Sequence, residues 1–188
     1  MLTKRFFDFL VCIFLVGLLS VPFFLIFLVV KFTSEGPAIY WSIRVGKNNE
    51  HFEMPKFRTM QIDTPEVASH LLSKPTNYLT KIGYFLRKTS LDEIPQLWSV
   101  LKGDMSIVGP RPALFNQYDL IDLRTFKNIH QLTPGITGWA QVNGRDNLSN
   151  AKKVFFDEEY LKKKSFFFDL KILCLTVIKI IQRDGVRH

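Results

Sequence analysis

Two adjacent carboxylates, Asp92 and Glu93, are followed in the sequence by an arginine between two prolines, Arg111. An ionised aspartate can act as a nucleophile, and a neighbouring glutamate can hold a hard cation such as Mg²⁺. A guanidinium group can clamp phosphate oxygens with two parallel hydrogen bonds. The three residues therefore indicate chemistry on a phosphate-bearing substrate, whereas an isolated Asp-Glu pair more often only begins a helix.

The residues around the acidic pair predict how it is positioned. Ser90 has the spacing of a capping box with Glu93, which predicts a helix that carries Asp92 in its first turn and ends at Gly103. Backbone N–H groups and the helix dipole would stabilise negative charge there. Residues 78–88 are also predicted to be helical, and they carry Arg87 five residues before Asp92. We therefore expect both carboxylates to be ionised and close to a cation.

Residues 38–60 alternate in polarity on either side of a turn-like segment, residues 46–49, and this predicts a β-hairpin. Its second arm leads to Lys56 and Arg58, which flank an aromatic residue and could face one phosphate site. Basic residues at the end of a strand are also commonly just solvated, so both interpretations stay open. One phase of the first arm is apolar: Ile39, Trp41 and Ile43.

Residues 9–30 contain no charged residue, and as a helix they would extend about 33 Å at ~1.5 Å per residue. That length reaches across a bilayer, so a membrane segment is predicted. The apolar run is too long for the core of a signal peptide, and no small-residue cleavage site follows it. We therefore expect the segment to remain in the mature protein.

Pro22 lies past the middle of this segment and removes a backbone donor, and Ser20 lies close to it. Basic residues flank both ends of the segment, so the positive-inside rule favours neither end crossing the membrane. Both a re-entrant helix that breaks near Ser20 and Pro22 and a kinked spanning helix fit these residues.

Residues 133–145 contain three glycines, which is typical of a shaped loop that comes close to a ligand. Four side chains in this loop could provide a stacking face and hydrogen bonds for a nucleotide: Trp139, Gln141, Asn143 and Arg145. Shorter helices are predicted over residues 64–75 and 114–129.

Residues 165–181 are mostly apolar but are interrupted by Asp169, Lys171 and Lys179, so they do not suit a membrane-spanning helix. A helix lying in the membrane interface would fit, with its lysines near anionic headgroups. Packing against the rest of the domain fits equally well. The side chains that would enter the lipid are Phe166, Phe167, Leu170, Leu173 and Ile178.

The composition of the chain narrows its class. It carries 25 Lys and Arg against 17 Asp and Glu, a net charge of +8, which favours an anionic partner. The basic residues do not form one stripe, so nucleic acid is not expected among the partners. Cys12 and Cys174 both lie in apolar stretches and are predicted to be free thiols in a reducing compartment.

Taken together, these motifs resemble the bacterial sugar transferase family, the monotopic phosphoglycosyl transferases, in their minimal catalytic form. The resemblance covers nearly the whole chain. The motifs that carry it are Lys4-Arg5-x-Phe7-Asp8, Lys56-Phe57-Arg58-Thr59-Met60, the block from Leu86 to Pro112, the segment from Pro134 to Arg145, Asp157-x-x-Tyr160 and Asp169-Leu170-Lys171.

The resemblance implies a reaction. Asp92 is similar to the family's nucleophile, which takes a phosphosugar from a UDP-sugar, releases UMP and passes the phosphosugar to undecaprenyl phosphate. Glu93 matches the family's Mg²⁺ ligand, and Asp157 matches a further family acid. The basic residues that would neutralise the donor's diphosphate are Lys56, Arg58, Arg87 and Arg111.

The resemblance also implies an architecture: an α+β, mostly helical fold with a re-entrant membrane helix, a small β-hairpin and interfacial amphipathic helices. Residues 1–31 would form the membrane helix-break-helix, and residues 32–188 the catalytic domain on the cytoplasmic face of the bacterial inner membrane. Anionic lipids are expected partners. The transferred sugar, the glycoconjugate pathway and the oligomeric state, with a homodimer as one option, stay open.

Three positions depart from the family's pattern. The family commonly has Ser-Pro at the helix break, where this chain has Ser20-Val21-Pro22, so the break is expected to shift by one position. Ser42 stands where Gln is frequent, and Ser99 where Asn is frequent. Rival hypotheses are a non-catalytic membrane-surface scaffold of the same fold and a lipid-phosphate phosphatase, which would release inorganic phosphate instead.

Overall fold

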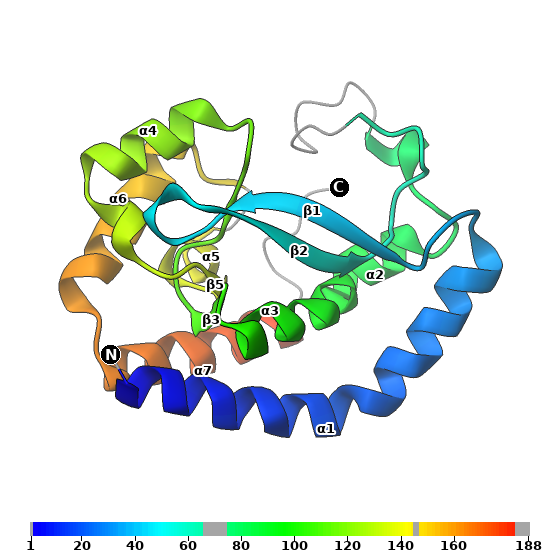
Figure 1. Cartoon of the computed structure of the whole chain (residues 1–188), viewed down its shortest axis with the longest axis horizontal. Helices are drawn as coiled ribbons and strands as arrows, with labels where there is room; N and C mark the ends of the chain where they lie inside the picture. The colour runs from blue at the N-terminus through cyan, green and yellow to red at the C-terminus, as the bar shows by residue number, and fades with distance from the viewer. Residues whose placement is uncertain (1, 66–74, 145–146, 183–188) are drawn as a thin grey trace.

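A computed structural model of the chain describes residues 2–65, 75–144 and 147–182. The fold is α+β and mostly helical, as predicted. The long helix α1 (Leu2–Thr33) runs along one side of the molecule, and a β-hairpin crosses the domain that lies against it (Figure 1). Within the described residues, α1 is the one helix whose length and apolar composition would suit a membrane crossing.

Helix α1 is continuous through Pro22, which lies inside it. Figure 1 shows the helix bending along its length. Proline lacks an N–H donor and its ring crowds the preceding turn, so it accounts for such a bend. The hydroxyl of Ser20 donates to the carbonyl oxygen of Gly17 at 2.9 Å. The interruption expected at Ser20 and Pro22 is therefore a bend within one helix rather than a gap between two.

The N-terminal end of α1 is attached to the domain by buried polar contacts. The carboxylate of Asp8 is buried and accepts hydrogen bonds from the hydroxyl of Ser106 at 2.7 Å and the amide of Ile107 at 3.2 Å. One turn earlier, Lys4 forms an ion pair with the buried Asp169. Buried charges are tolerated where they are paired in this way. These contacts fix the first turns of α1 to the domain.

The C-terminal half of α1 is attached to the same domain by apolar packing. Val30 is fully buried in a cluster with Ala38, Phe57 and Leu86. The ring of Phe23 lies 5.0 Å from that of Phe57. Both ends of α1 therefore contact one domain, while much of the helix surface between them is apolar and exposed.

The predicted hairpin is present. Strand β1 (Ile39–Val45) pairs antiparallel with β2 (His51–Phe57), and the short helix η1 (Lys47–Asn49) joins them. Ser42 lies opposite Met54, and both are buried. In the middle of the apolar phase of β1, Trp41 and Ile43 are 49% and 43% exposed, whereas Ile39 and Val45 at its ends pack against the domain. The hairpin thus contacts the domain with its polar face in the middle of β1 and with apolar side chains at both ends of the strand.

Two further strand pairings complete the sheets. Strand β4 (Ala113–Leu114) pairs with the free edge of β1, and β3 (Ser106–Val108) pairs in parallel with β5 (Gly135–Thr137). Where β3 ends, a Cβ placed on Gly135 would lie 2.1 Å from the backbone nitrogen of Gly109. Gly135 therefore allows two backbone segments to approach each other closely, and the expected approach of this loop to a ligand stays a prediction.

Short helices fill the rest of the described chain. They confirm the helices predicted near residues 78–88 and 114–129, at shorter lengths, whereas the predicted helix over residues 64–75 falls mostly outside the described residues. The helices are η3 (Pro75–Tyr78), α2 (Gly83–Thr89), η4 (Leu91–Gln96), α3 (Leu97–Lys102), α4 (Tyr118–Phe126), η5 (Ile129–Gln131), α5 (Trp139–Val142), α6 (Asn150–Lys163) and α7 (Phe166–Gln182).

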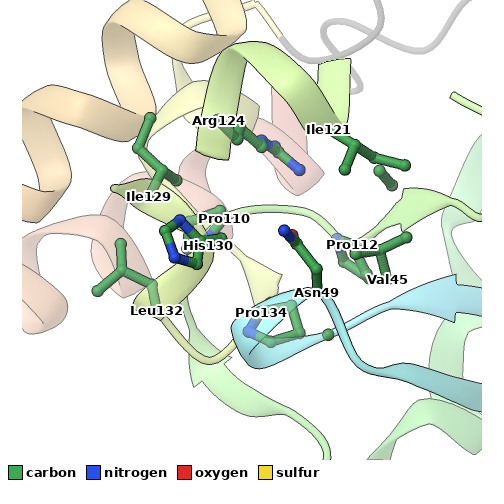
Figure 2. Close-up of a pocket in the computed structure, with 12 residues that line it drawn as sticks. Val45, Asn49, Pro110, Pro112, Ile121, Arg124, Ile129, His130, Leu132 and Pro134 are labelled. Carbon is green, nitrogen blue, oxygen red and sulfur yellow. The ribbon is translucent and has the colours of Figure 1, made fainter. Parts of the chain in front are cut away.

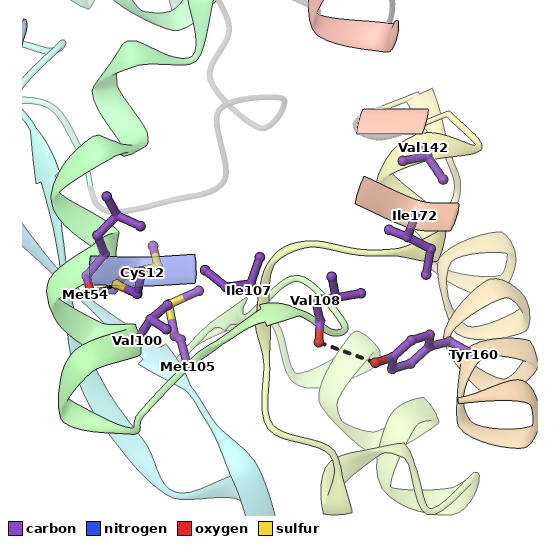
Figure 3. Packing of buried hydrophobic residues seen from close by; sticks show 10 residues of the cluster. Cys12, Met54, Val100, Met105, Ile107, Val108, Val142, Tyr160 and Ile172 are labelled. Carbon is purple, nitrogen blue, oxygen red and sulfur yellow. Dashed lines mark hydrogen bonds between the residues drawn. The ribbon is translucent and has the colours of Figure 1, made fainter. Parts of the chain in front are cut away.

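The main hydrophobic core joins distant parts of the chain (Figure 3). Cys12 from α1, Val100 from α3 and Ile172 from α7 are all fully buried and belong to one cluster, with Cys12 and Val100 at one end and Ile172 at the other. The hydroxyl of Tyr160, on α6, donates to the carbonyl oxygen of Val108 at 3.3 Å. Burial of such side chains stabilises a fold by roughly 1.5–3 kcal/mol each. The core therefore holds α1, α3, α6 and α7 around β3.

Helix α7 packs against the rest of the domain, which was one of the two interpretations offered for residues 165–181. Ile172 and Leu173 face the core, and Asp169 is 5% exposed and paired with Lys4. The opposite side leaves Phe167 80% exposed. One face of α7 therefore packs against the domain while the other presents large apolar side chains.

Candidate active site

The acidic pair lies on η4, between α2 and α3. The chain enters η4 through Ser90, whose backbone is left-handed, with φ 57° and ψ 17°. Such a conformation is uncommon for a residue with a side chain, and it turns the chain sharply. A capping serine needs an extended backbone, and Ser90 makes no side-chain capping bond to η4 in the described structure. The predicted capping box is therefore wrong, and Glu93 is directed elsewhere.

Glu93 is the meeting point of three segments. Its Oε1 accepts a hydrogen bond from Nη2 of Arg111 at 2.7 Å and from Nζ of Lys56 at 3.3 Å. Lys56 comes from β2 and Arg111 from the loop between β3 and β4. The Glu93 side chain is only 11% exposed, so these ion pairs are partly shielded from water. The structure thus brings together three residues that the sequence analysis singled out separately.

Asp92 is buried, with 7% of its surface exposed. Burial raises the pKa of its carboxyl group, and the charges of Lys56, Arg87 and Arg111 oppose that shift. Burial also lowers the pKa of Lys56 to about 8, against the opposing effect of Glu93. The charge state of the pair therefore depends on neighbouring cations, and not on the first turn of an α-helix as expected.

Arg87 and Arg58, the other two basic residues predicted to bind phosphate, lie in different surroundings. Nε of Arg87 donates to the hydroxyl of Thr59 at 3.0 Å, and the positive charge of Arg87 lowers the pKa of Asp92. Arg58 is buried, and its Nη2 donates to the carbonyl oxygen and the hydroxyl of Ser34, at 3.0 and 2.9 Å. Arg58 follows the last residue of β2. The alternation of side chains along the strand, which directs Lys56 toward Glu93, therefore does not determine the direction of Arg58. The structure places Arg58 against the connection between α1 and β1.

Arg44 joins the site although the sequence analysis gave it no catalytic part. Its Nε donates to the hydroxyl of Ser42 at 3.0 Å, and its Nη1 to the carbonyl oxygen of Pro112 at 3.5 Å. Burial lowers its pKa to about 10, and the charge of Arg111 adds to that effect. The sequence could have predicted this position, because side chains alternate along a strand and Arg44 and Ser42 therefore lie on the same face of the hairpin as Lys56.

The side chains predicted to bind a nucleotide are engaged within the domain. Nε1 of Trp139 donates to Glu159 at 2.7 Å, and Asn143 donates to the carbonyl oxygen of Trp139 at 2.7 Å. Gln141 donates to a main-chain carbonyl of its own loop at 3.3 Å. Arg145 lies outside the described residues. The nucleotide-binding role of these four residues stays a prediction.

Asp157 is also placed away from the acidic pair. It is 1% exposed and forms an ion pair with Arg124, whose Nη2 lies 2.6 Å from its Oδ2. Burial raises the pKa of Asp157, and Arg124 opposes the shift. Asp157 is therefore a buried residue that links α6 to α4, and its predicted role in binding the nucleotide sugar stays a prediction.

The donor set suits one kind of metal. Among residues 2–65, 75–144 and 147–182, no group of three or more His, Cys, Asp or Glu side chains could hold a metal ion by itself. Mg²⁺ is commonly bound by one or two carboxylates together with substrate phosphates. Glu93, beside Asp92, fits a Mg²⁺ that arrives with a phosphorylated substrate.

The site as a whole is a pair of carboxylates surrounded by four cations: Lys56, Arg87, Arg111 and Arg44. Fixed cations in a partly dry site stabilise the charge of phosphate groups more than they would in water. A carboxylate among them is well placed to react with phosphorus. The arrangement therefore suits phosphoryl chemistry on a polyanionic substrate.

The chain is similar in sequence to several bacterial proteins. A protein of Bacillus subtilis (strain 168) named uncharacterized sugar transferase EpsL is 44% identical over 190 residues, which cover 100% of this chain and 92% of that protein. The exopolysaccharide production protein ExoY of Rhizobium meliloti (strain 1021) is 36% identical over 199 residues, covering 98% and 88%.

The UDP-glucose:undecaprenyl-phosphate glucose-1-phosphate transferase of Escherichia coli (strain K12) is 40% identical over 186 residues, covering 95% of this chain but 40% of that enzyme. The chain thus spans most of the length of EpsL and ExoY and less than half of the Escherichia coli enzyme. A family model described as bacterial sugar transferase matches residues 1–183. The chain therefore belongs to the bacterial sugar transferase family.

Proposed function

We propose that the protein transfers a phosphosugar from a UDP-sugar to undecaprenyl phosphate, through a covalent intermediate on Asp92. The observation that carries the proposal is the cluster of Lys56, Arg87 and Arg111 around the acidic pair. The names of relatives support the substrate class, because the Escherichia coli relative is named as acting on UDP-glucose and undecaprenyl phosphate.

The reaction takes place in two displacements at one phosphorus atom. A carboxylate oxygen of Asp92 attacks the phosphorus that bears the sugar, and the bond from that phosphorus to the bridging oxygen breaks. UMP leaves with the electron pair of that bond. An oxygen of undecaprenyl phosphate then attacks the same phosphorus, the bond to Asp92 breaks, and the carboxylate is regenerated.

Arg111 and Lys56 can bind the phosphates of the donor in different ways. Arg111 can clamp two phosphate oxygens, whereas Lys56 offers a compact point charge that is already desolvated. In the structure both are held by Glu93, so the incoming diphosphate must share or replace that carboxylate as their partner. Such preorganised cations stabilise the charge that moves onto the leaving UMP.

The proposal includes Mg²⁺, held by Glu93 with substrate phosphates as its further ligands. When bound, Mg²⁺ offsets the negative charge of the donor's diphosphate. The fit rests on the partly buried carboxylate of Glu93, which points into the cationic cluster beside Asp92. Glu93 would then leave Lys56 and Arg111 free to face the phosphates.

The proposal also places the protein in the bacterial inner membrane as a monotopic protein on the cytoplasmic face. The attachment of both ends of α1 to one domain supports a re-entrant arrangement, because a spanning helix would separate its ends by the bilayer. The exposed apolar surfaces of α1 and α7 would then enter one leaflet, with anionic lipids around the basic residues.

Labelling of single cysteines tests this topology. With a cysteine at position 2 and another after Lys31, we expect a membrane-impermeant maleimide to reach neither from the periplasm in intact cells. Replacing both Ser20 and Pro22 with Leu should straighten α1 and move the N-terminus across. Periplasmic labelling of position 2 in the unmodified helix contradicts the re-entrant arrangement.

Single-turnover measurement tests the chemistry. Purified protein given UDP-glucose or UDP-galactose without lipid acceptor should release about one UMP per active site, because the first displacement needs only Asp92. Intact-protein mass spectrometry should then show the mass of a phosphosugar on the chain. UMP release that requires undecaprenyl phosphate, with no mass adduct, excludes the covalent route, and inorganic phosphate as the product indicates a phosphatase.

A further inference from the structure

The loop that carries Arg111 is held in place through its carbonyl groups. Pro110 and Pro112 have no N–H donors, so the loop has few amides with which to bond. Its three consecutive carbonyl oxygens accept hydrogen bonds from three other segments. The donors are the amide of Gly135 to Pro110 at 2.9 Å, Nη1 of Arg124 to Arg111 at 2.8 Å, and Nη1 of Arg44 to Pro112 at 3.5 Å.

Arg124 is the donor at the centre of this set, and it is itself anchored. Its Nε and Nη2 both donate to Oδ2 of Asp157, at 3.0 and 2.6 Å. Figure 2 shows Arg124 reaching from α4 toward the segment that contains Pro110 and Pro112, beside a cavity of about 30 Å³. A cavity of that volume holds about one water molecule, and Arg124 contacts the loop directly through its 2.8 Å hydrogen bond to the carbonyl oxygen of Arg111.

These contacts form a continuous path between two acids that do not touch. Asp157 on α6 holds Arg124 on α4, and Arg124 holds the main chain of Arg111. The guanidinium of Arg111 in turn donates to Glu93 on η4 at 2.7 Å. A displacement at either of the first two residues would therefore change where the Arg111 side chain begins.

We infer that Arg124 and Asp157 are positioning residues, which hold the Arg111 main chain so that its guanidinium faces Glu93. Under the function proposed above, they thereby aim Arg111 at the donor's diphosphate. This assigns Asp157 to geometry and not to binding of the nucleotide sugar. It also explains why an ion pair is buried here, since buried pairs add little stability beyond what apolar packing would provide.

The role suits arginine in particular. The guanidinium presents its N–H groups in a rigid planar fork, so Arg124 can hold a carboxylate with one edge and a carbonyl with the remaining nitrogen. A lysine has a single nitrogen on a flexible chain and would keep the ion pair with Asp157 without fixing Arg111. Arg124→Lys therefore separates positioning from charge.

The test is a double-mutant cycle between Arg124 and Arg111, measured as kcat/KM for the UDP-sugar. We expect Arg124→Lys to lower kcat/KM by about 10- to 100-fold, mainly through a higher KM, because a misplaced clamp binds the diphosphate poorly. In an Arg111→Ala background the same change should cost less than about twofold further, because its target is gone. Losses that multiply overturn the inference.

Lys127 and Glu158 provide a matched control. Their ion pair, at 3.2 Å, also links the end of α4 to α6, but it is more exposed and does not contact the Arg111 loop. Lys127→Ala should leave kcat/KM within about twofold of wild type, as expected for a surface pair. A loss equal to that of Arg124→Lys would mean that the α4–α6 contact in general is needed, which overturns a specific positioning role.

Hydrogen–deuterium exchange gives a second readout that does not depend on turnover. In Arg124→Lys, amides between residues 106 and 114 should exchange faster than in wild type and in Lys127→Ala, because the loop has lost its central contact. Unchanged exchange overturns the inference. If wild-type protein transfers no phosphosugar, the proposed function fails, while the exchange result still decides whether Arg124 holds the loop.

Discussion

Two buried aspartates, Asp92 and Asp157, are alike in burial and differ in what surrounds them. Both are less than a tenth exposed, and burial raises the pKa of both. Asp157 receives two hydrogen bonds from Arg124, a partner that is itself buried. Asp92 lies in the field of several cations, two of which pair with Glu93.

Under the proposed function, this difference distinguishes a structural acid from a reactive one. A carboxylate held by two hydrogen bonds from one buried arginine has a fixed geometry and little freedom to form a bond. A carboxylate beside cations that are shared with a neighbour can meet a phosphorylated substrate, because the substrate can take over those cations. Burial alone therefore does not distinguish the two aspartates, whereas the number of cations around each of them does.

The largest expected effect is that of Asp92→Asn on catalysis. The amide is nearly isosteric but cannot act as the nucleophile, so we expect turnover to fall by at least about 10³-fold with no covalent adduct. Unfolding free energy should change by less than about 1 kcal/mol, since the variant removes a charge that burial disfavours. Activity near wild type would transfer the nucleophile's role to another group.

Glu93→Gln should have the second largest effect. We expect kcat to fall by about 10²-fold, because the amide is a poor ligand for a hard cation. EDTA should abolish wild-type turnover and added Mg²⁺ restore it. The variant should need far more Mg²⁺ for half-maximal rate, and an unchanged Mg²⁺ requirement would remove Glu93 from the metal site.

Asp157→Asn should differ from Asp92→Asn by lowering stability, in addition to the loss of kcat/KM expected when Arg124 no longer holds Arg111. Loss of this carboxylate leaves the charge of Arg124 buried without a counter-ion, which costs about 3 kcal/mol of stability. The melting temperature should fall by roughly 10 °C for a chain of this size. A variant that is as stable as wild type but inactive would place Asp157 in the chemistry, and the two aspartates would then be alike.

The pH dependence of kcat/KM for the donor tests whether the charge of Lys56, near Asp92, is needed for binding. The pKa of Lys56 is lowered to about 8, so Lys56 is cationic below that pH and loses its proton as the pH rises through it. We expect kcat/KM for the donor to fall by about tenfold per pH unit above pH 8, since a neutral amine does not bind phosphate. Lys56→Arg should move this fall to higher pH, and an unmoved profile would assign it to another group.

The smallest effect is expected at Trp139. Trp139→Phe keeps the ring packing and removes the hydrogen bond to Glu159, which contributes about 1 kcal/mol to stability. We expect the KM for the UDP-sugar to change by less than about twofold, because the indole is occupied within the domain. A KM raised tenfold or more would instead support the predicted stacking on the nucleotide.

Local patterns predicted much of the molecule. The long apolar run, the hairpin around residues 46–49 and the chemical character of Asp92, Glu93 and Arg111 all follow from residue types and their spacing. These features depend on neighbours in sequence, where periodicity and turn chemistry act. The predicted capping box is wrong because it used only this local spacing. The left-handed backbone at Ser90 lies where α2 meets η4, and the spacing of Ser90 and Glu93 does not predict it.

Contacts between distant segments were decided only by the tertiary structure. Sequence alone establishes that this chain has two carboxylates, a proline-flanked arginine and a membrane-seeking helix. The fold decides that Lys56 and Arg44 face Glu93 while Arg58 turns to Ser34, because strand register and strand ends determine which side each residue takes. It also decides that Asp157 is linked to Arg111 through Arg124, since a path through two helices and a main-chain carbonyl leaves no periodic signal in the sequence.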